Sequence, residues 1–118
     1  MIMITFDNSL PEYASPCERP LIQAAVDMFL EDDNAVSVWD GEELSVQGCR
    51  DKAYILKNLS QTGEDTVEVY DKDGDIRGWF YLIYNNGSEN EPMIVISDYS
   101  SNEWSERVYR RLDERFGE

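Results

Sequence analysis

The feature that constrains this chain most is a pair of apolar runs on either side of an Asp-Gly turn. Thr66–Tyr70 alternates apolar and polar residues as a half-buried strand does, and Gly78–Tyr84 is a continuous apolar run. Between them, Asp73-Gly74 offers the positive φ that a tight hairpin needs. The runs therefore predict two antiparallel strands, and the unbroken second run predicts a strand near the centre of the sheet, with neighbours on both sides.

Three further segments are expected to complete the sheet. Val36–Trp39 and Leu44–Val46 flank Asp40-Gly41, and this arrangement predicts a second hairpin. Met93–Ile96 follows a polar loop around Asn86-Gly87 and is expected to pair back onto the sheet.

Helical patterns occupy the remaining segments. Pro20 suits the first turn of a helix, and apolar residues recur at helical spacing from Leu21 to Phe29. A second helix is expected from about Cys49 to Ser60, with Gly63 as its left-handed cap.

The last helix is expected to start near Ser100 or Asn102, because Ser100 and Glu103 have the spacing of a capping box. The elements together predict an α+β fold, with a mainly antiparallel sheet of about five strands and three helices on one of its faces. The expected order is α-β-β-α-β-β-β-α. A length of 118 residues predicts a single domain over residues 1–118, in which residues 1–20 form an irregular N-terminal arm. Within that arm, residues 1–6 are expected as a short edge strand or an ordered arm.

Composition narrows the functional classes. The formal net charge is −15, and such a charge repels nucleic acid and anionic membranes and attracts basic surfaces. Histidine is absent, which excludes Ser-His-Asp and Cys-His nucleophilic sites and zinc sites that use imidazole. Cys17 and Cys49 are expected as free thiols of a reduced cytoplasm, with a structural disulfide as the alternative. Met1–Phe6 is too short for the apolar core of a signal peptide, so we expect a cytoplasmic protein.

No motif predicts catalysis or a cofactor. The segment Asp71–Asp75 does not have the spacing of an EF-hand calcium loop, which needs oxygen ligands at positions 1 and 12. If Gly74 is at position 6, these two positions are occupied by Val69 and Phe80. This segment is interpreted as a hairpin turn. There is no Walker loop and no dinucleotide fingerprint. We therefore expect a protein that is not an enzyme and holds no cofactor or metal.

Acidic residues cluster along the chain. Between Asp27 and Glu43 there are seven acids and no base, and between Glu64 and Asp75 there are six acids against Lys72. Negative charge at Glu31, Asp32 and Asp33 opposes the dipole of the first helix. Such clusters either form an ordinary solvated face or imitate the charge of nucleic acid.

The residues expected to contact a partner come from these clusters. Strand alternation places Trp39 and Ser37 on the face opposite Val36 and Val38, so Trp39 is either a binding hot spot beside carboxylates or a cover for the sheet edge. The candidate contacts are Asp32, Asp33, Trp39, Asp40, Glu42 and Glu43, with Glu64, Asp65 and Glu68 as a second patch.

Several stretches resemble a group of small acidic accessory proteins of phages and plasmids. They are Val38–Glu43, Glu64–Thr66, Gly78-Trp79 through Tyr84–Gly87, and Ile96–Ser100, and the likeness spans roughly residues 21–100. The resemblance implies a genomic context, because such proteins often block host defence by imitating nucleic acid. It implies no catalytic residue.

The sequence thus predicts a non-enzymatic binding protein of a mobile element. Its expected partner is a basic nucleic-acid-handling host protein, in an anti-CRISPR-like or antirestriction role, with no direct nucleic-acid or membrane contact. The alternative is an immunity protein that neutralises a basic nuclease toxin. A metal-dependent hydrolase and a self-associating virion component are further possibilities that the residues leave open.

Overall fold

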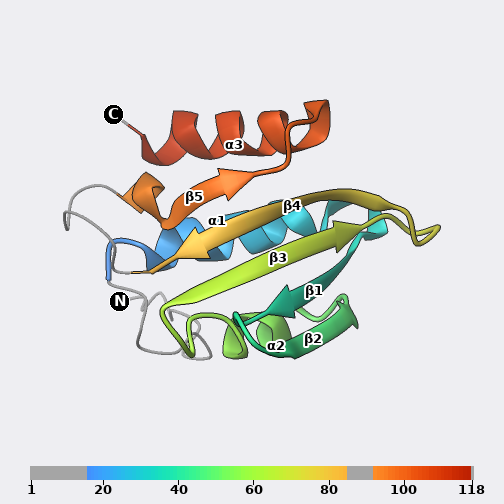
Figure 1. Ribbon diagram of the computed structural model, residues 1–118. Coiled ribbons are helices and arrows are strands. Elements are labelled where there is room, and N and C mark those ends of the chain that lie inside the picture. The colour runs from blue at the N-terminus through green and yellow to red at the C-terminus, as the bar shows by residue number, and fades with distance from the viewer. Residues whose placement is uncertain (1–15, 85–91, 118) are drawn as a thin grey trace, which may run out of the picture.

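The computed structural model describes residues 16–84 and 92–117, in which helices and strands follow one another in nearly the expected order. The elements are α1 Arg19–Phe29, the short 3₁₀ helix η1 Glu31–Asp33, β1 Ala35–Trp39, β2 Leu44–Cys49, α2 Lys52–Lys57, β3 Glu64–Tyr70, β4 Ile76–Ile83, the 3₁₀ helix η2 Pro92–Val95, β5 Ile96–Tyr99 and α3 Glu103–Phe116. The strands form a five-stranded sheet in the order β2-β1-β3-β4-β5 (Figure 1). Every neighbouring pair is antiparallel. The α+β fold and its antiparallel sheet are therefore confirmed.

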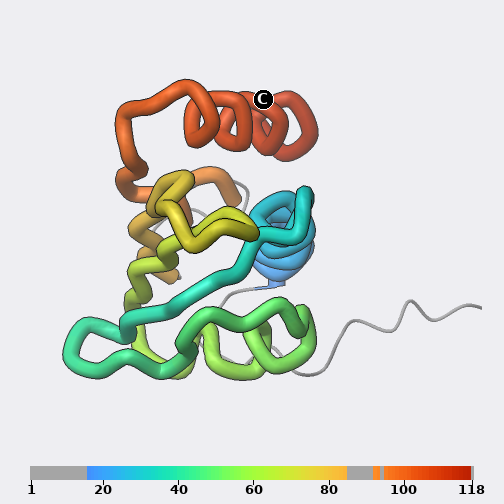
Figure 2. The backbone as a smooth tube through the Cα atoms, turned by 90° about the vertical axis from the view of Figure 1, so that its right-hand side faces the viewer, coloured from blue at the N-terminus to red at the C-terminus, as the bar shows by residue number. Residues whose placement is uncertain are grey.

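The helices lie on one side of this sheet. Helices α1 and α2 lie behind the strands in Figure 1, and α3 runs beside β5 and contacts both β4 and α1. The view turned by 90° shows the strands on the left, with α1 and α2 on their right (Figure 2). No helix of the described residues covers the other face of the sheet.

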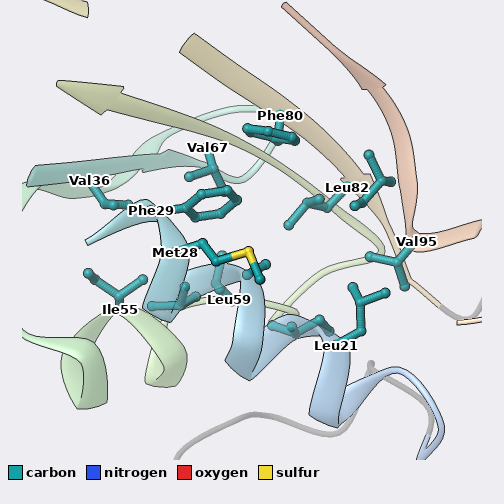
Figure 3. Packing of buried hydrophobic residues seen from close by; sticks show 14 of the residues in the cluster. Leu21, Met28, Phe29, Val36, Ile55, Leu59, Val67, Phe80, Leu82 and Val95 are labelled. Atoms are coloured by element: carbon teal, nitrogen blue, oxygen red, sulfur yellow. The ribbon is translucent and has the colours of Figure 1, made fainter. Parts of the chain in front are cut away.

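Strand alternation fills the core between the sheet and the helices. Val67 of β3 and Phe80 of β4 are fully buried and pack towards Phe29 of α1 (Figure 3). The Phe29 and Phe80 ring centroids lie 4.9 Å apart. Burial of each such side chain contributes roughly 1.5–3 kcal/mol relative to exposure. The expected interior position of the apolar run is confirmed, because β4 pairs with β3 on one side and β5 on the other.

The second helix is shorter than expected. It spans Lys52–Lys57, since the Asp51 side chain caps it by accepting hydrogen bonds from the backbone N–H groups of Ala53 and Tyr54. After it, Ser60 and not Gly63 takes the left-handed conformation, with a φ of 55°. The Gly63 cap was therefore a wrong prediction.

In the C-terminal segment, the start of the last strand and the capping box at Ser100 differ from expectation, whereas the helix start at Asn102 is one of the two expected. Pro92–Val95 forms η2, so the last strand begins at Ile96 and not at Met93. In α3 the side chain of Asn102 caps the helix by accepting from the N–H of Ser105 at 2.8 Å. Ser100 instead meets Ser105, with their hydroxyl oxygens 2.6 Å apart. The expectations for residues 1–6 and for the Asn86-Gly87 loop lie outside the described residues.

Gly78 is where α3 comes closest to the sheet. A Cβ added at Gly78 would lie 2.2 Å from Oγ of Ser105 and 2.7 Å from Oγ of Ser100. We therefore expect Gly78→Ala to lower the free energy of unfolding by about 1–3 kcal/mol, through overpacking of the contact between β4 and α3. Urea unfolding followed by circular dichroism measures the change.

Gly63→Ala is the matched control, because no atom lies within 4 Å of a Cβ added there. It should stay within about 0.5 kcal/mol of the wild type. Equal stabilities of the two variants would show that the close approach at Gly78 is not required.

Candidate partner-binding surface

The uncovered face of the sheet carries a mixture of aromatic and acidic side chains. Register places Trp39 of β1 opposite Thr66 of β3, and Thr66 opposite Tyr81 of β4. Glu68 lies opposite Trp79 in the same way. These side chains share one face because Val67 and Phe80, one position along each strand, point into the core.

Hydrogen bonds from aromatic donors hold the carboxylates of this face. The indole Nε1 of Trp39 donates to Oε1 of Glu68 at 3.2 Å, and the Tyr70 hydroxyl donates to the same oxygen at 2.8 Å. The Tyr81 hydroxyl donates to Oε2 of Glu64 at 2.7 Å. These hydrogen bonds raise the pKa of Tyr70 and the pKa of Tyr81, so both phenols stay protonated as donors near neutral pH.

The turn between β1 and β2 carries three more carboxylates, those of Asp40, Glu42 and Glu43, beside the start of β3. Oδ1 of Asp40 accepts from the backbone N–H groups of Glu42 and Glu43 at 3.0 and 2.9 Å. These two bonds favour the charged form and lower the pKa of Asp40. Gly41 has a φ of 105°, and a Cβ added to it would lie 3.6 Å from Oε1 of Glu64. The turn is thus built by its own carboxylate and lies directly beside the start of β3.

We call the resulting surface the acidic-aromatic patch; it consists of Trp39, Asp40, Glu42, Glu43, Glu64 and Glu68. Trp39 is 42% exposed, as the alternation of β1 predicts, while Val36 and Val38 are fully buried. The ion pairs among the described residues are Asp27–Lys52, Glu103–Arg107 and Glu31–Arg111. They involve α1, η1, α2 and α3, so within the described chain no basic side chain pairs with a carboxylate of the patch.

Asp32 and Asp33 do not belong to the patch. They lie in η1, before the start of β1, whereas Trp39 ends that strand. Five extended residues separate the two ends by about 17 Å. Both aspartates have positive φ, and the backbone oxygen of Asp33 accepts from Nε of Arg50 at 3.0 Å. Asp32 and Asp33 therefore lie at the opposite end of β1 from the Asp40 turn, and their role as partner contacts stays a prediction.

Asp65 was also predicted as a contact, and the structure contradicts this because Asp65 is 1% exposed. Its Oδ2 accepts from the N–H of Ser60 at 2.8 Å and from the Tyr84 hydroxyl at 2.6 Å. Oδ1 is buried and has no hydrogen-bond partner. Burial raises the pKa of Asp65 to about 6 against the two hydrogen bonds, which lower it. The signal was present in the sequence: Asp65 shares the inward parity of Val67 and Val69.

Tyr70 and Tyr81 are the residues of this surface that sequence reasoning missed. Both stand on strands at outward positions, which alternation could have shown. Their bonds to Glu68 and Glu64 depend on cross-strand register and rotamers, which the sequence alone does not give. A hollow of about 440 Å³ lies next to Tyr70, lined among others by Ser37, Trp39 and Glu68.

The described residues contain neither a group of metal ligands nor a membrane-spanning helix. Among the described residues, no three or more His, Cys, Asp or Glu side chains are grouped so that they could hold a metal ion. Cys49 is a free thiol. No helix in the described ranges is long and apolar enough to span a bilayer. Comparisons of the chain with protein-family models, curated proteins and solved structures gave no match.

The buried Asp65 predicts a pH dependence of stability. The folded protein binds the Asp65 proton more tightly than the unfolded chain, in which the ordinary value of 3.8 applies. The stability that Asp65 contributes is therefore greatest at low pH and falls as the pH rises through its folded pKa, by about 3 kcal/mol in full. About half of this loss falls between about pH 5 and about pH 7.5.

Urea unfolding at a series of pH values, compared with Asp65→Asn, isolates this contribution. We expect the wild type to lose stability relative to Asp65→Asn as the pH rises, since the amide does not ionise. Asp73→Asn removes the same charge at an exposed position, and its free energy of unfolding should vary with pH as that of the wild type does. Parallel profiles of wild type and Asp65→Asn would show that Asp65 titrates as an ordinary carboxyl group.

Proposed function

We propose that this chain is a non-enzymatic inhibitor that docks its acidic-aromatic patch onto a basic nucleic-acid-handling protein. The observation that carries the proposal is that Glu64 and Glu68 share the uncovered sheet face with the exposed Trp39, next to a turn that carries Asp40, Glu42 and Glu43. No described basic side chain forms an ion pair with any of these five carboxylates. Cationic surfaces that bind phosphate would meet fixed negative charge on this face.

Three of the five carboxylates are held by backbone or aromatic donors. Asp40 is fixed by two backbone N–H groups, and Glu68 by Trp39 and Tyr70. Side chains that are already ordered lose less conformational freedom when a partner binds. This favours a binding surface over a solvated acidic face, in which carboxylates extend freely into water.

Trp39 adds an apolar contact at the middle of this charge. Trp residues are enriched at binding hot spots, and an exposed ring beside carboxylates suits an arginine-rich partner. The role in a mobile element, as an antagonist of host defence, rests on the resemblance to phage and plasmid accessory proteins. An immunity protein for a basic nuclease would use the same surface, and the identity of the partner separates the two.

Charge reversal tests the patch. We expect Glu42→Lys/Glu43→Lys to weaken binding to the basic partner by well over tenfold, about 1.4 kcal/mol or more, because it places repelling charges at the interface. Asp40 is kept because it holds the turn. The matched control is Glu106→Lys/Glu114→Lys on the exposed side of α3, which gives the same net charge away from the patch.

The partner is captured on the immobilised protein from lysate of the host, at about 50 mM and at about 500 mM salt, since pairing of exposed charges weakens with salt. The purified partner is then assayed for affinity to each variant and for its nucleic-acid activity in the presence of the protein. A captured protein that DNA displaces, and whose activity the wild type inhibits, supports the proposal; a nuclease with its gene adjacent identifies the immunity role. Equal affinity of the patch variant and the α3 control would overturn the assignment of the surface.

A further inference from the structure

The hollow on the uncovered face owes its existence to small residues. The outward positions of β1 before Trp39 are Ala35 and Ser37, and β2 contributes Gly48, whose N–H donates to Oγ of Ser37 at 2.9 Å. Tyr70 pairs with Ala35, so Tyr70 and Trp39 stand about 13 Å apart along β1. Large rings at the two ends and small side chains between them leave a volume of about 440 Å³, within the range of pockets that take small ligands.

Glu68 lies in the middle of this hollow, opposite Ser37. Its Oε1 already accepts from both Trp39 and Tyr70. Its Oε2 accepts no hydrogen bond from any described residue, and no described Lys or Arg forms an ion pair with it. The hollow therefore presents one oriented carboxylate, with half of its accepting capacity unused, between two aromatic rings.

The rim of the hollow has a polarity of its own. Arg50, Asp71 and Lys72 line it at the end near Tyr70, and Nε of Arg50 donates to the backbone oxygen of Asp33. Asp40, Glu42 and Glu43 lie beyond Trp39 at the other end. The three carboxylates at the Trp39 end attract a cation, whereas at the Tyr70 end the charge of Asp71 offsets one of the two positive charges. A cation is therefore favoured on the Trp39 side of Glu68.

Arginine fits this arrangement better than lysine. A planar guanidinium can donate to Oε2 of Glu68 while one of its faces stacks on an aromatic ring, whereas an ammonium group offers no plane for stacking. We propose that the hollow is a docking site for a single arginine side chain of the basic partner, which binds Glu68 and stacks on Trp39. This inference rests on the proposed function and names the chemistry that the surface recognises.

The test is a titration of ¹⁵N-labelled protein with N-acetyl-arginine amide, followed by NMR at about 100 mM salt. The expected result is a saturable shift of the Trp39 indole N–H and of the backbone amides of Ser37 and Glu68. N-acetyl-lysine amide should bind several-fold more weakly. N-acetyl-citrulline amide, which has the shape of arginine without its charge, should cause no saturable shift.

Glu68→Gln is the decisive variant, because glutamine can still accept from Trp39 and Tyr70 but carries no charge. We expect it to weaken arginine binding by about tenfold or more, while Glu114→Gln, the same charge change on α3, leaves it unchanged. The two spectra without ligand show whether each variant is folded. No saturable shift, an equal response to citrulline, or equal affinity of Glu68→Gln and wild type would overturn the docking site.

The outcomes separate this inference from the proposed function. If Glu42→Lys/Glu43→Lys loses partner binding but arginine causes no shift at Trp39, the inhibitory surface is supported and the arginine site is contradicted. Arginine binding that depends on Glu68, without any protein captured through the patch, supports the site and removes the inhibitory role.

Discussion

The two-residue alternation of β3 is the constraint on which the rest of the molecule depends. Val67 and Val69 point to the helices and are fully buried, while Glu64 and Glu68 point to the uncovered face. A slip of one residue would place both glutamates in the core and both valines in water, so the register of the whole sheet is fixed by this strand. The same alternation that builds the core therefore also builds the acidic-aromatic patch.

Acidic side chains near the helices and those of the patch are stabilised in different ways. The bidentate contact of Arg111 with Glu31, at 2.8 and 2.9 Å, neutralises an acid at the end of α1 and lowers the pKa of Glu31. That contact relieves the unfavourable charge that the sequence places at this helix end. Asp40, Glu64 and Glu68 of the patch receive hydrogen bonds, and no described basic side chain forms an ion pair with a patch carboxylate, so their mutual repulsion remains in the free protein. A cationic partner would remove it.

The parts of the fold that follow from local chemistry could be predicted from the sequence. Asp40-Gly41 and Asp73-Gly74 each carry a glycine with positive φ between paired strands, as their turn chemistry requires. Predictions failed where local and tertiary preferences compete. Val95 is fully buried in a 3₁₀ turn, because an apolar run satisfies the core equally well as a helix or as a strand. Asp65 was assigned to the surface by its charge, although its parity on β3 directs it inward.

The acidic-aromatic patch could not be predicted from local sequence, because it depends on contacts between distant segments. Acidic composition predicts negative charge somewhere on the molecule, but only the pairing of β1 with β3 brings Trp39 near Glu68, and only the hairpin turn brings Gly41 against Glu64. Both contacts join segments that are more than twenty residues apart, so neither has a signature in a local window. Glu64 and Glu68 stand on a paired strand, and Asp40 is held by the N–H groups of its own turn, so these three carboxylates are positioned by folding itself. The repulsion among them is then a property of the native state, and the basic surface proposed as the partner would lower it.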